Sequence, residues 1–332
     1  MKTNIALIGL GYWGPNLLRN FNSLGVLKSV FDLDSDKIEK FEESYNNVYF
    51  GTDWEPHVKD KRFGIDAVAI ATPPETHCDI AIRALNMGKH VFIEKPMTAT
   101  VEEAEKIIKV AKKKNKIVMV GHTFLYTPEV RKIKELIDAG ELGDIQYIHA
   151  LRLNLGKFQK SNVVMDLAPH DLSIFNYLLN SRVRKTHTKG YSFIDKKVVE
   201  VAFLTLEYDN GSVCHLHLSW LDPLKTRTTT IVGTKKMLIY DMLAEEKIKV
   251  YDKGVDVDNI SSYGDYLLTY RHGDIWSPHT KVWEPLGLEC KHFIECIETN
   301  KTPLTDGENG LEVVKALSGA MKSLKTGVEV WL

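Results

Sequence analysis

Two short motifs carry residues whose types fit an acid–base reaction. Lys95 lies in the sequence EKP at residues 94–96, and the sequence DLAPH at residues 166–170 places Asp166 and His170 four positions apart. On a helix, this spacing brings both side chains to one face. Histidine is the natural proton acceptor near neutral pH, and a lysine beside it can stabilise a developing negative charge. Each motif also has a structural interpretation: a solvated lysine at a strand end, an N-cap aspartate with a proline in the first turn, and a buried histidine.

A glycine-rich motif, GLGYWG at residues 9–14, has the GxGxxG spacing of dinucleotide sites. It follows a strand pattern at residues 4–8 and precedes a helical stretch at residues 15–21, which is the context that the motif requires. Glycines there allow a tight turn and let the backbone approach a pyrophosphate at the helix N-terminus, although a plain glycine-rich turn is the alternative. The residues expected at this end of a dinucleotide are Gly9, Gly11, Tyr12, Trp13 and Gly14.

Asp32 ends the second strand pattern, 18 positions after the last glycine of this motif. A carboxylate there can accept hydrogen bonds from the adenosine ribose and repel a 2′-phosphate, although a loop cap is the structural alternative. No arginine lies between residues 33 and 37, so we expect NAD as the cofactor, while Lys37 leaves NADP open. Residues at other strand ends complete the expected cofactor set: Thr72, Pro73, His77, Glu94 and Lys95. Of these, Pro73 is explained equally well as a residue that only terminates a strand.

The elements that must position these residues change in character along the chain. Through about the first 120 residues, apolar runs alternate with amphipathic stretches, which predicts parallel strands at residues 4–8, 27–31, 48–50, 67–71, 90–93 and 117–120. Longer β-rich segments at residues 145–153, 198–208, 212–220, 228–233 and 236–240 predict a large, mostly antiparallel sheet. Helices at residues 168–179, 286–298 and 309–324 should cover one face, and residues 328–332 should add an edge strand. The fold class is therefore α/β, with domains at residues 1–122 and 123–332 and a last segment that can pack back on the first domain.

Bulk properties exclude several classes of function. A length of 332 residues favours two domains, and 43 basic against 44 acidic side chains leave a net charge of -1, unlike a typical nucleic-acid-binding protein. No apolar run has membrane-spanning length and no signal peptide is evident, so we expect a cytoplasmic protein without a membrane partner. The four cysteines have no CxxC spacing, so we expect free thiols and no metal site.

Taken together, the motifs resemble the glucose-fructose oxidoreductase/inositol dehydrogenase/MocA (Gfo/Idh/MocA) family. The resemblance covers almost the whole chain, including VGH at residues 120–122 and the segment at residues 303–310 before the last helix. It implies a Rossmann domain with a doubly wound parallel sheet, followed by an open, mostly antiparallel α/β domain whose sheet face forms a homodimer or homotetramer interface. It also implies a cis bond between Lys95 and Pro96 and a catalytic trio of Lys95, Asp166 and His170.

The activity that the resemblance implies is that of an NAD(P)-dependent dehydrogenase acting on CH–OH groups of sugars. His170 would take the hydroxyl proton as hydride leaves for the nicotinamide, while Lys95 would stabilise the oxygen and Asp166 would orient the sugar. Lys95 as the base is an alternative that the sequence leaves open. Further substrate contacts are expected, with an ordinary exposed strand end as the alternative for some, from His122, Arg152, Asn154, Lys157 and Arg227.

The sequence of residues 165–171 most resembles the corresponding motif of members that act on nucleotide sugars, especially UDP-N-acetylglucosamine 3-dehydrogenases. UDP-N-acetylglucosaminuronate 3-dehydrogenases are the nearest alternative, and inositol or free-sugar dehydrogenases follow. Two rivals come from other classes: a dinucleotide-sensing regulator without catalysis, and an NAD-dependent glycosidase. Net formation of NADH would separate a dehydrogenase from both.

Overall fold

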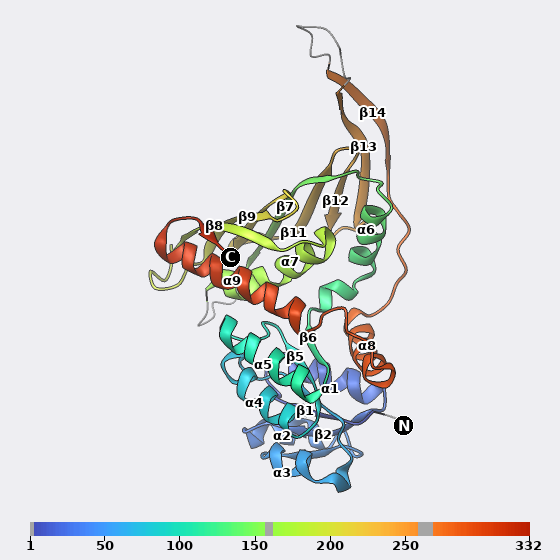
Figure 1. Ribbon diagram of the computed structural model, residues 1–332, viewed down its shortest axis with the longest axis vertical. Coiled ribbons are helices and arrows are strands. Elements are labelled where there is room, and N and C mark those ends of the chain that lie inside the picture. The colour runs from blue at the N-terminus through green and yellow to red at the C-terminus, as the bar shows by residue number, and fades with distance from the viewer. Residues whose placement is uncertain (1–2, 157–161, 258–267) are drawn as a thin grey trace. The chain divides into compact units, whose positions relative to one another are not determined.

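The chain divides into two compact units (Figure 1). The computed structural model describes residues 3–156, 162–257 and 268–332. The first unit holds Met1–Tyr126 and Trp283–Lys315, and the second holds Thr127–Val282 and Ala316–Leu332. Residues 283–315 thus return to the first unit, although the sequence analysis counts them with the second domain. A physical reason is the core contact of Phe293 with Phe92, whose ring centroids lie 5.6 Å apart.

The first unit is built on a six-stranded parallel sheet with the strand order β3-β2-β1-β4-β5-β6. The order reverses between β1 and β4, and open α/β sheets bind ligands at the carboxyl ends of the strands beside such a reversal. The doubly wound parallel sheet expected from the sequence is confirmed. Its strands are β1 Ile5–Ile8, β2 Leu27–Phe31, β3 Tyr49–Gly51, β4 Ala67–Ile70, β5 His90–Glu94 and β6 Val118–Gly121.

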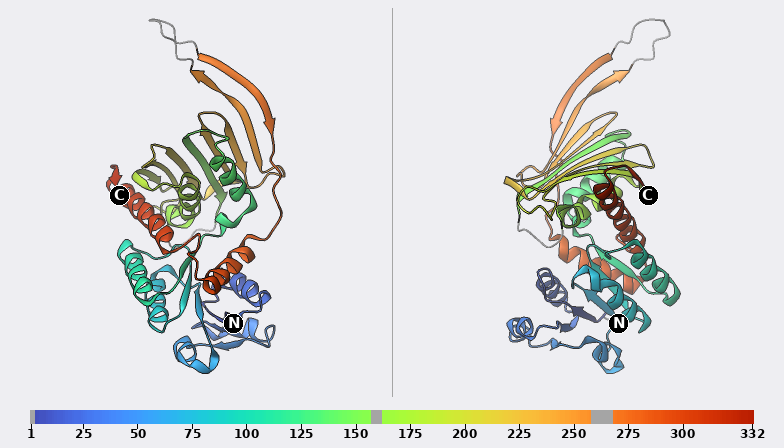
Figure 2. Two further views of the ribbon diagram at one scale, coloured as in Figure 1. Left: turned by 45° about the vertical axis from the view of Figure 1, so that its right-hand side comes forward. Right: turned by 90° about the vertical axis from the view of Figure 1, so that its left-hand side faces the viewer.

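Helices cover both faces of this parallel sheet (Figure 2). Because neither face meets water, β1 and β4 are apolar and buried along their whole length. A capping box between Thr100 and Glu103 begins α5, and Asn115 ends it in the left-handed conformation with a φ of 51°. The helices are α1 Gly14–Ser23, α2 Ser35–Glu42, α3 Trp54–Lys59, α4 Pro74–Asn86, α5 Val101–Lys114 and α8 Pro285–Thr299.

The second unit is built on a nine-stranded sheet with the order β14-β13-β12-β11-β7-β10-β9-β8-β15. All neighbouring strands are antiparallel except β7 and β10, which confirms the large, mostly antiparallel sheet. Its strands are β7 Ile145–Leu155, β8 Val183–Tyr191, β9 Val201–Tyr208, β10 Val213–Ser219, β11 Leu221–Gly233, β12 Met237–Asp241, β13 Ile248–Val257, β14 Leu268–Trp276 and β15 Val330–Trp331.

Among the described residues, helices pack on one face of this sheet and none covers the other (Figure 2). α6 Pro128–Asp138, α7 Val163–Leu179 and the part of α9 Gly307–Thr326 after Lys315 belong to this unit. α7 packs on β7, β9 and β10, and β9 alternates between buried and half-buried positions, as expected for a strand covered on one side.

Three strands of the second unit, β8, β13 and β14, are absent from the sequence predictions. Each is rich in charged and polar residues, so it lacks the apolar pattern by which strands are recognised, and pairing with neighbouring strands decides its structure. The predicted edge strand at the C-terminus is present, since Val330 pairs with Thr186 of β8. No helix in the described ranges is long and apolar enough to cross a membrane.

Candidate functional site

The glycine-rich loop has the geometry that a dinucleotide requires. Gly9 has a φ of +103°, and a Cβ there would lie 2.6 Å from the Ala71 carbonyl oxygen. A Cβ on Gly14 would lie 2.1 Å from the Gly9 carbonyl oxygen, so neither position accepts a side chain. At Gly11 the nearest atom would be 3.9 Å away, which leaves room for a ligand to approach the backbone. α1 begins at Gly14, so its amide groups are available to a pyrophosphate.

Asp32 anchors this loop from the end of β2. Its Oδ2 accepts a hydrogen bond from Leu10 N–H at 2.6 Å, and its Oδ1 accepts from Asp34 N–H at 3.0 Å. Lys37 Nζ lies 3.4 Å from Oδ1. The loop-cap interpretation of Asp32 is therefore correct. Binding of the ribose stays a prediction, and the neighbouring Lys37 is the cation that kept NADP open.

His77 holds the ends of two strands together. Its Nε2 lies 2.8 Å from the carbonyl oxygen of Thr72, and its Nδ1 lies 3.1 Å from that of Pro96. The ring is 1 % exposed, and burial lowers its pKa. Both ring nitrogens thus face backbone carbonyls, so His77 supports the backbone at Thr72 and Pro96, and its contact with a cofactor stays a prediction.

Lys95 follows β5 at the carboxyl edge of the sheet, and the cis bond to Pro96 that the resemblance implies is present. Its backbone N–H donates to Glu94 Oε2 at 3.2 Å. Burial raises the pKa of Glu94 to about 8, against the opposing effect of Lys95 and of a hydrogen bond from Trp13. Trp13 belongs to the glycine-rich loop, so the loop and the EKP motif meet at Glu94.

Glu289 is a buried acid of the same region that the sequence analysis missed. It lies on α8, accepts a hydrogen bond from Thr123 Oγ1 at 2.7 Å, and is 0 % exposed. Burial raises its pKa well above the usual range, and the nearby Glu94 raises it further. A sequence signal existed: Glu289 falls on the apolar stripe of α8, three residues after Leu286 and four before Phe293.

His122 completes this buried polar cluster at the end of β6. It is 2 % exposed, and its pKa is lowered to about 3 by burial and then by Lys95. Within the described residues, both of its ring nitrogens and the Oε1 atoms of Glu94 and Glu289 have no hydrogen-bond partner. Buried polar atoms are normally paired, so this cluster fits a polar ligand such as the nicotinamide end of NAD.

Asp166 and His170 lie on α7 of the second unit, one turn apart and both half-buried. The helix begins at Val163, earlier than the predicted residue 168, because the Asn162 side chain accepts from the N–H groups of Val164 and Met165. The N-cap interpretation of Asp166 is therefore wrong. Its Oδ2 instead accepts from Trp220 Nε1 at 3.2 Å, which ties it to the sheet.

Two arginines of the sheet lie near this part of α7. Arg152 of β7 forms a bidentate ion pair with Asp171, with its Nη2 at 2.9 Å from Oδ1, and both side chains are buried. Arg227 of β11 donates to Asn154 Oδ1 and to the Leu153 carbonyl, and burial lowers its pKa to about 10. Lys157 lies outside the described residues.

The predicted site residues thus fall into two groups. The first unit brings Lys95 together with Glu94, His122 and the glycine-rich loop, and the second brings Asp166 and His170 together with Arg152, Asn154 and Arg227. In the described ranges no cluster of three or more His, Cys, Asp or Glu side chains could hold a metal ion, and the four cysteines are free and buried.

Family models match both halves of the chain. Residues 3–122 match the model described as an oxidoreductase family with an NAD-binding Rossmann fold, and residues 130–239 match the GFO/IDH/MocA C-terminal domain. The chain belongs to the Gfo/Idh/MocA family. As a member of this family, it is an NAD-dependent oxidoreductase that acts on CH–OH groups.

Similar proteins within the Gfo/Idh/MocA family act on different substrates. The scyllo-inositol 2-dehydrogenase of Bacillus subtilis is 29% identical over 81% of this chain and 78% of its own. The UDP-N-acetylglucosamine 3-dehydrogenase of Acidithiobacillus ferrooxidans is 26% identical over 95% of each chain. A solved structure of the latter enzyme has a TM-score of 0.84 at 22% identity and covers 98% of both chains, which shows that the fold is shared.

Proposed function

We propose that this enzyme oxidises the C3 hydroxyl of UDP-N-acetylglucosamine, with NAD as the hydride acceptor. The observation that carries the proposal is the placement of the trio residues: Lys95 directly follows β5 of the NAD-binding unit, and Asp166 and His170 lie one turn apart on α7. The choice of substrate is supported by the sequence of residues 165–171 and by the similarity to a UDP-N-acetylglucosamine 3-dehydrogenase over 95% of each chain.

The proposed chemistry requires the trio at one substrate hydroxyl. His170 takes the hydroxyl proton while the carbon–hydrogen bond breaks and the carbonyl forms, since an alkoxide-like oxygen expels hydride more readily. NAD supplies the hydride acceptor when bound. Lys95 donates a hydrogen bond to the same oxygen and stabilises its negative charge. The exchange of roles, with Lys95 as the base, stays an alternative.

Asp166 is a positioning residue in this proposal. Trp220 Nε1 donates to its Oδ2 and holds the carboxylate in place, and the proposed role of this carboxylate is to orient a sugar hydroxyl. The buried pair of Arg152 with Asp171 fixes α7 on β7 next to His170. Because Arg152 is 3 % exposed and paired, its proposed contribution to substrate binding is through this support.

The proposed cofactor contacts follow from the geometry of the first unit. Gly9, Gly11 and Gly14 are the proposed residues of the pyrophosphate loop, and Asp32, which follows β2, is the proposed partner of the adenosine ribose. The unpaired oxygen of Glu94 and the ring of His122 are the proposed partners at the nicotinamide end. For the diphosphate of the substrate, Arg227 is the proposed cation, with Asn154 holding its guanidinium.

A second candidate substrate is an inositol. The observation in its favour is the similarity to the scyllo-inositol 2-dehydrogenase, which is 29% identical over 285 residues. An inositol lacks the diphosphate, so it would gain nothing from Arg227, and this difference makes the two candidates separable. A non-catalytic regulator is disfavoured because the chain keeps Lys95, Asp166 and His170.

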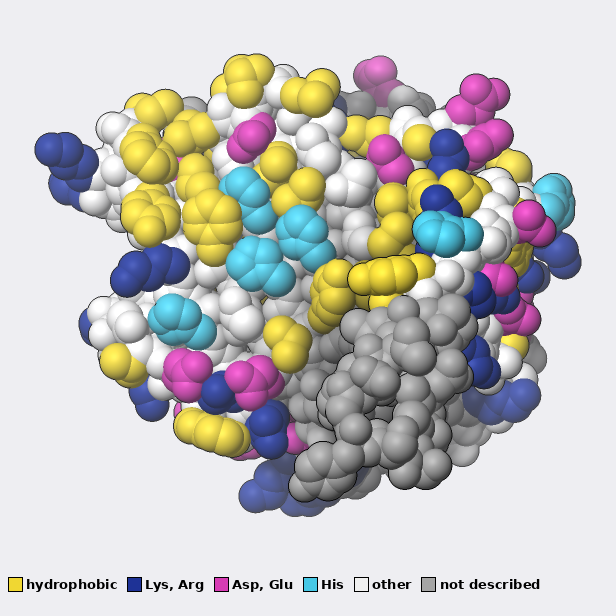
Figure 3. All heavy atoms as spheres, turned by 90° about the horizontal axis from the view of Figure 1, so that it is seen from above, with side chains coloured by type: hydrophobic (Ala, Val, Ile, Leu, Met, Phe, Trp, Pro, Cys, Tyr) yellow, Lys and Arg dark blue, Asp and Glu magenta, His cyan; other side chains and the backbone are white. Residues whose placement is uncertain are grey.

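The open face of the second unit's sheet supports a proposed homodimer or homotetramer. Looking onto this face, Figure 3 shows histidine side chains gathered among hydrophobic ones. His149 and His215 lie side by side with ring centroids 5.7 Å apart, and Phe203 stacks on His217 at 4.3 Å. Tyr147 on the same face is 46% exposed. Aromatic residues exposed together in this way are typical of interfaces between subunits.

A cytoplasmic location is proposed as well, because free thiols persist in reducing compartments.

The test is a direct competition between substrates. Turnover efficiency with NAD is measured for UDP-N-acetylglucosamine, its uronic acid, UDP-glucose and myo-inositol, with NADH followed by absorbance. Mass spectrometry should show a product about two mass units below the substrate, as the loss of two hydrogens requires. UDP-N-acetylglucosamine should be preferred, and Arg227→Met should raise its KM while leaving KM for inositol unchanged. A preference for inositol or for the uronic acid would contradict the proposed substrate but not the dehydrogenase activity.

A further inference from the structure

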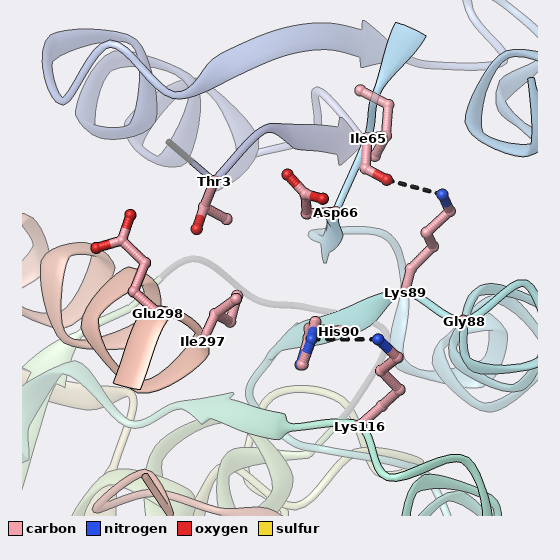
Figure 4. A pocket seen from close by; sticks show the side chains of 9 residues that line it. All are labelled: Thr3, Ile65, Asp66, Gly88, Lys89, His90, Lys116, Ile297 and Glu298. Carbon is pink, nitrogen blue, oxygen red and sulfur yellow. Dashed lines mark hydrogen bonds between the residues drawn. The ribbon is translucent and has the colours of Figure 1, made fainter. Parts of the chain in front are cut away.

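A pocket of about 300 Å³ opens at the amino ends of the parallel strands in the first unit (Figure 4). This is the edge opposite to the one that carries the glycine-rich loop and Lys95, so the proposed reaction makes no use of it. Its polar lining comes from the segments that lead into four strands and from the end of α8: Thr3, Asp66, Lys89, His90, Lys116 and Glu298.

His90, at the start of β5, presents a hydrogen-bond donor to this pocket. The backbone N–H of Ile117 donates to His90 Nδ1 at 3.0 Å, so that nitrogen must be an acceptor. Burial and the nearby Lys116 lower the pKa of His90 to about 4, which keeps the ring neutral at pH 7. A neutral imidazole carries one N–H proton, and because Nδ1 is an acceptor, this proton lies on Nε2.

Lys116 meets this donor with a second one. Its Nζ lies 3.4 Å from His90 Nε2, as the dashed line in Figure 4 marks. An ammonium group can only donate, so two donors face each other without an acceptor between them. An oxygen on the pocket side, bridging the two nitrogens, would accept from both, and an anionic oxygen would accept more strongly than water.

Lys89 adds a cation from another wall of the pocket. Its Nζ donates to the Ile65 carbonyl at 2.7 Å, which uses one of the three N–H groups of the ammonium. Burial lowers the pKa of Lys89, and the neighbouring Lys116 acts in the same direction, whereas Asp66 opposes it. An anion in the pocket would therefore stabilise the charge on both lysines.

Two carboxylates also line the pocket, and both are exposed. Asp66 Oδ2 accepts from Asn4 N–H at 2.9 Å, and Figure 4 shows Glu298 on the side away from the lysines. In the ranges that the structure describes, neither forms an ion pair with Lys89 or Lys116. The donors of His90 and Lys116 therefore lack a carboxylate acceptor from these two residues.

We propose that this pocket binds a small oxyanion, a phosphate or carboxylate group, with one oxygen bridging His90 Nε2 and Lys116 Nζ from the pocket side. A further oxygen would accept from Lys89. The site lies outside the proposed active centre, so the inference is independent of the substrate assignment.

The first test follows His90 directly in the protein saturated with NAD, so that the dinucleotide site cannot take up the probe. Inorganic phosphate or sodium acetate is titrated at constant ionic strength set with sodium chloride, which separates binding from screening. The ring resonances of His90 are assigned by NMR with His90→Asn. Phosphate or acetate should shift them saturably and raise the pKa of His90, because an anion stabilises the imidazolium. Tighter binding of phosphate than of acetate would assign the pocket to phosphate groups, and the reverse order to carboxylates. Resonances that respond to neither anion would overturn the proposal.

The second test compares two lysine variants by calorimetric titration of the better-binding anion. Lys116→Met removes a lining cation, and Lys113→Met removes an exposed lysine of α5 that is not part of the pocket. Lys116→Met should lose at least about tenfold in affinity, the scale of one charge-assisted hydrogen bond, while Lys113→Met should bind like the wild type. Equal affinities of the two variants would contradict the site.

Discussion

At the residue scale, the trio assignment can be tested on single side chains. Lys95→Ala and His170→Asn should each lower turnover by at least about a hundredfold, as expected for the loss of an oxyanion donor or a proton acceptor. NAD affinity, measured by fluorescence titration, should stay within a few-fold because neither change alters the glycine-rich loop. Lys113→Ala, on the exposed surface, is the control. Near-normal turnover of a folded variant would remove that residue from the trio.

Glu94 and Glu289 place two carboxyl groups in the interior of the first unit, and this arrangement has a pH signature. The pKa of Glu94 rises from 4.5 to about 8, and that of Glu289 also rises. Between the pKa of a carboxyl group in the unfolded state and its raised pKa in the folded state, the folded protein keeps a proton that the unfolded protein has released. The free energy of unfolding must therefore fall as the pH rises through this window, by up to about 1.4 kcal/mol per pH unit for each group.

Glu289→Gln removes one of these groups, while its amide oxygen can still accept from Thr123. We expect the fall in the free energy of unfolding between about pH 5 and pH 8 to become shallower in this variant. Urea denaturation at several pH values measures this slope. Glu295→Gln, on the exposed side of α8, is the matched control and should follow the wild type. Parallel curves for Glu289→Gln and the wild type would show that Glu289 is ionised in the folded protein.

At the element scale, α7 is held on β7 by the buried pair of Arg152 and Asp171. Asp171→Asn leaves a buried guanidinium without its counter-charge and should lower the free energy of unfolding by about 3 kcal/mol. Replacing both partners, as in Arg152→Met with Asp171→Leu, should cost less than the single change because no charge is left unpaired. Urea denaturation of the three proteins measures this. A double variant that is less stable than Asp171→Asn would indicate that the pair contributes net stability.

The same element explains why Asp171 matters for the proposed reaction. It follows His170 directly on α7, so a helix that shifts on the sheet moves the proposed base. Trp220 fixes the preceding turn through Asp166 in the same way. α7 is therefore the element whose position determines the geometry of two of the three proposed catalytic residues.

At the scale of the whole molecule, the open sheet face should control assembly. Tyr147→Glu places a charge on the proposed interface, where it would have to be desolvated on association. We expect this variant to have a lower molar mass than the wild type in size-exclusion chromatography with light scattering. Tyr49→Glu, an equally exposed tyrosine of the first unit, should leave the mass unchanged. A wild-type protein that is already monomeric would contradict the proposed assembly.

Local sequence patterns were sufficient for the NAD-binding half, whereas the trio followed from the family resemblance and stays a prediction. Parallel strands buried on both faces are apolar runs, and the glycines at residues 9 and 14 are required by backbone geometry alone, so both leave a direct mark on the sequence. The capping box of α5 is likewise a contact between residues three positions apart.

Tertiary structure alone decided the features that depend on partners distant in the chain. The charged strands β8, β13 and β14 exist because neighbouring strands pair with them. From the sequence, Arg152 is expected to bind a ligand, yet its guanidinium forms a bidentate ion pair with Asp171 of α7. Glu289 and Glu94 are almost 200 positions apart, and their shared burial follows from the return of residues 283–315 to the first unit. The charge state of such groups depends on desolvation, which is set by packing from all sides and leaves no local pattern in the sequence.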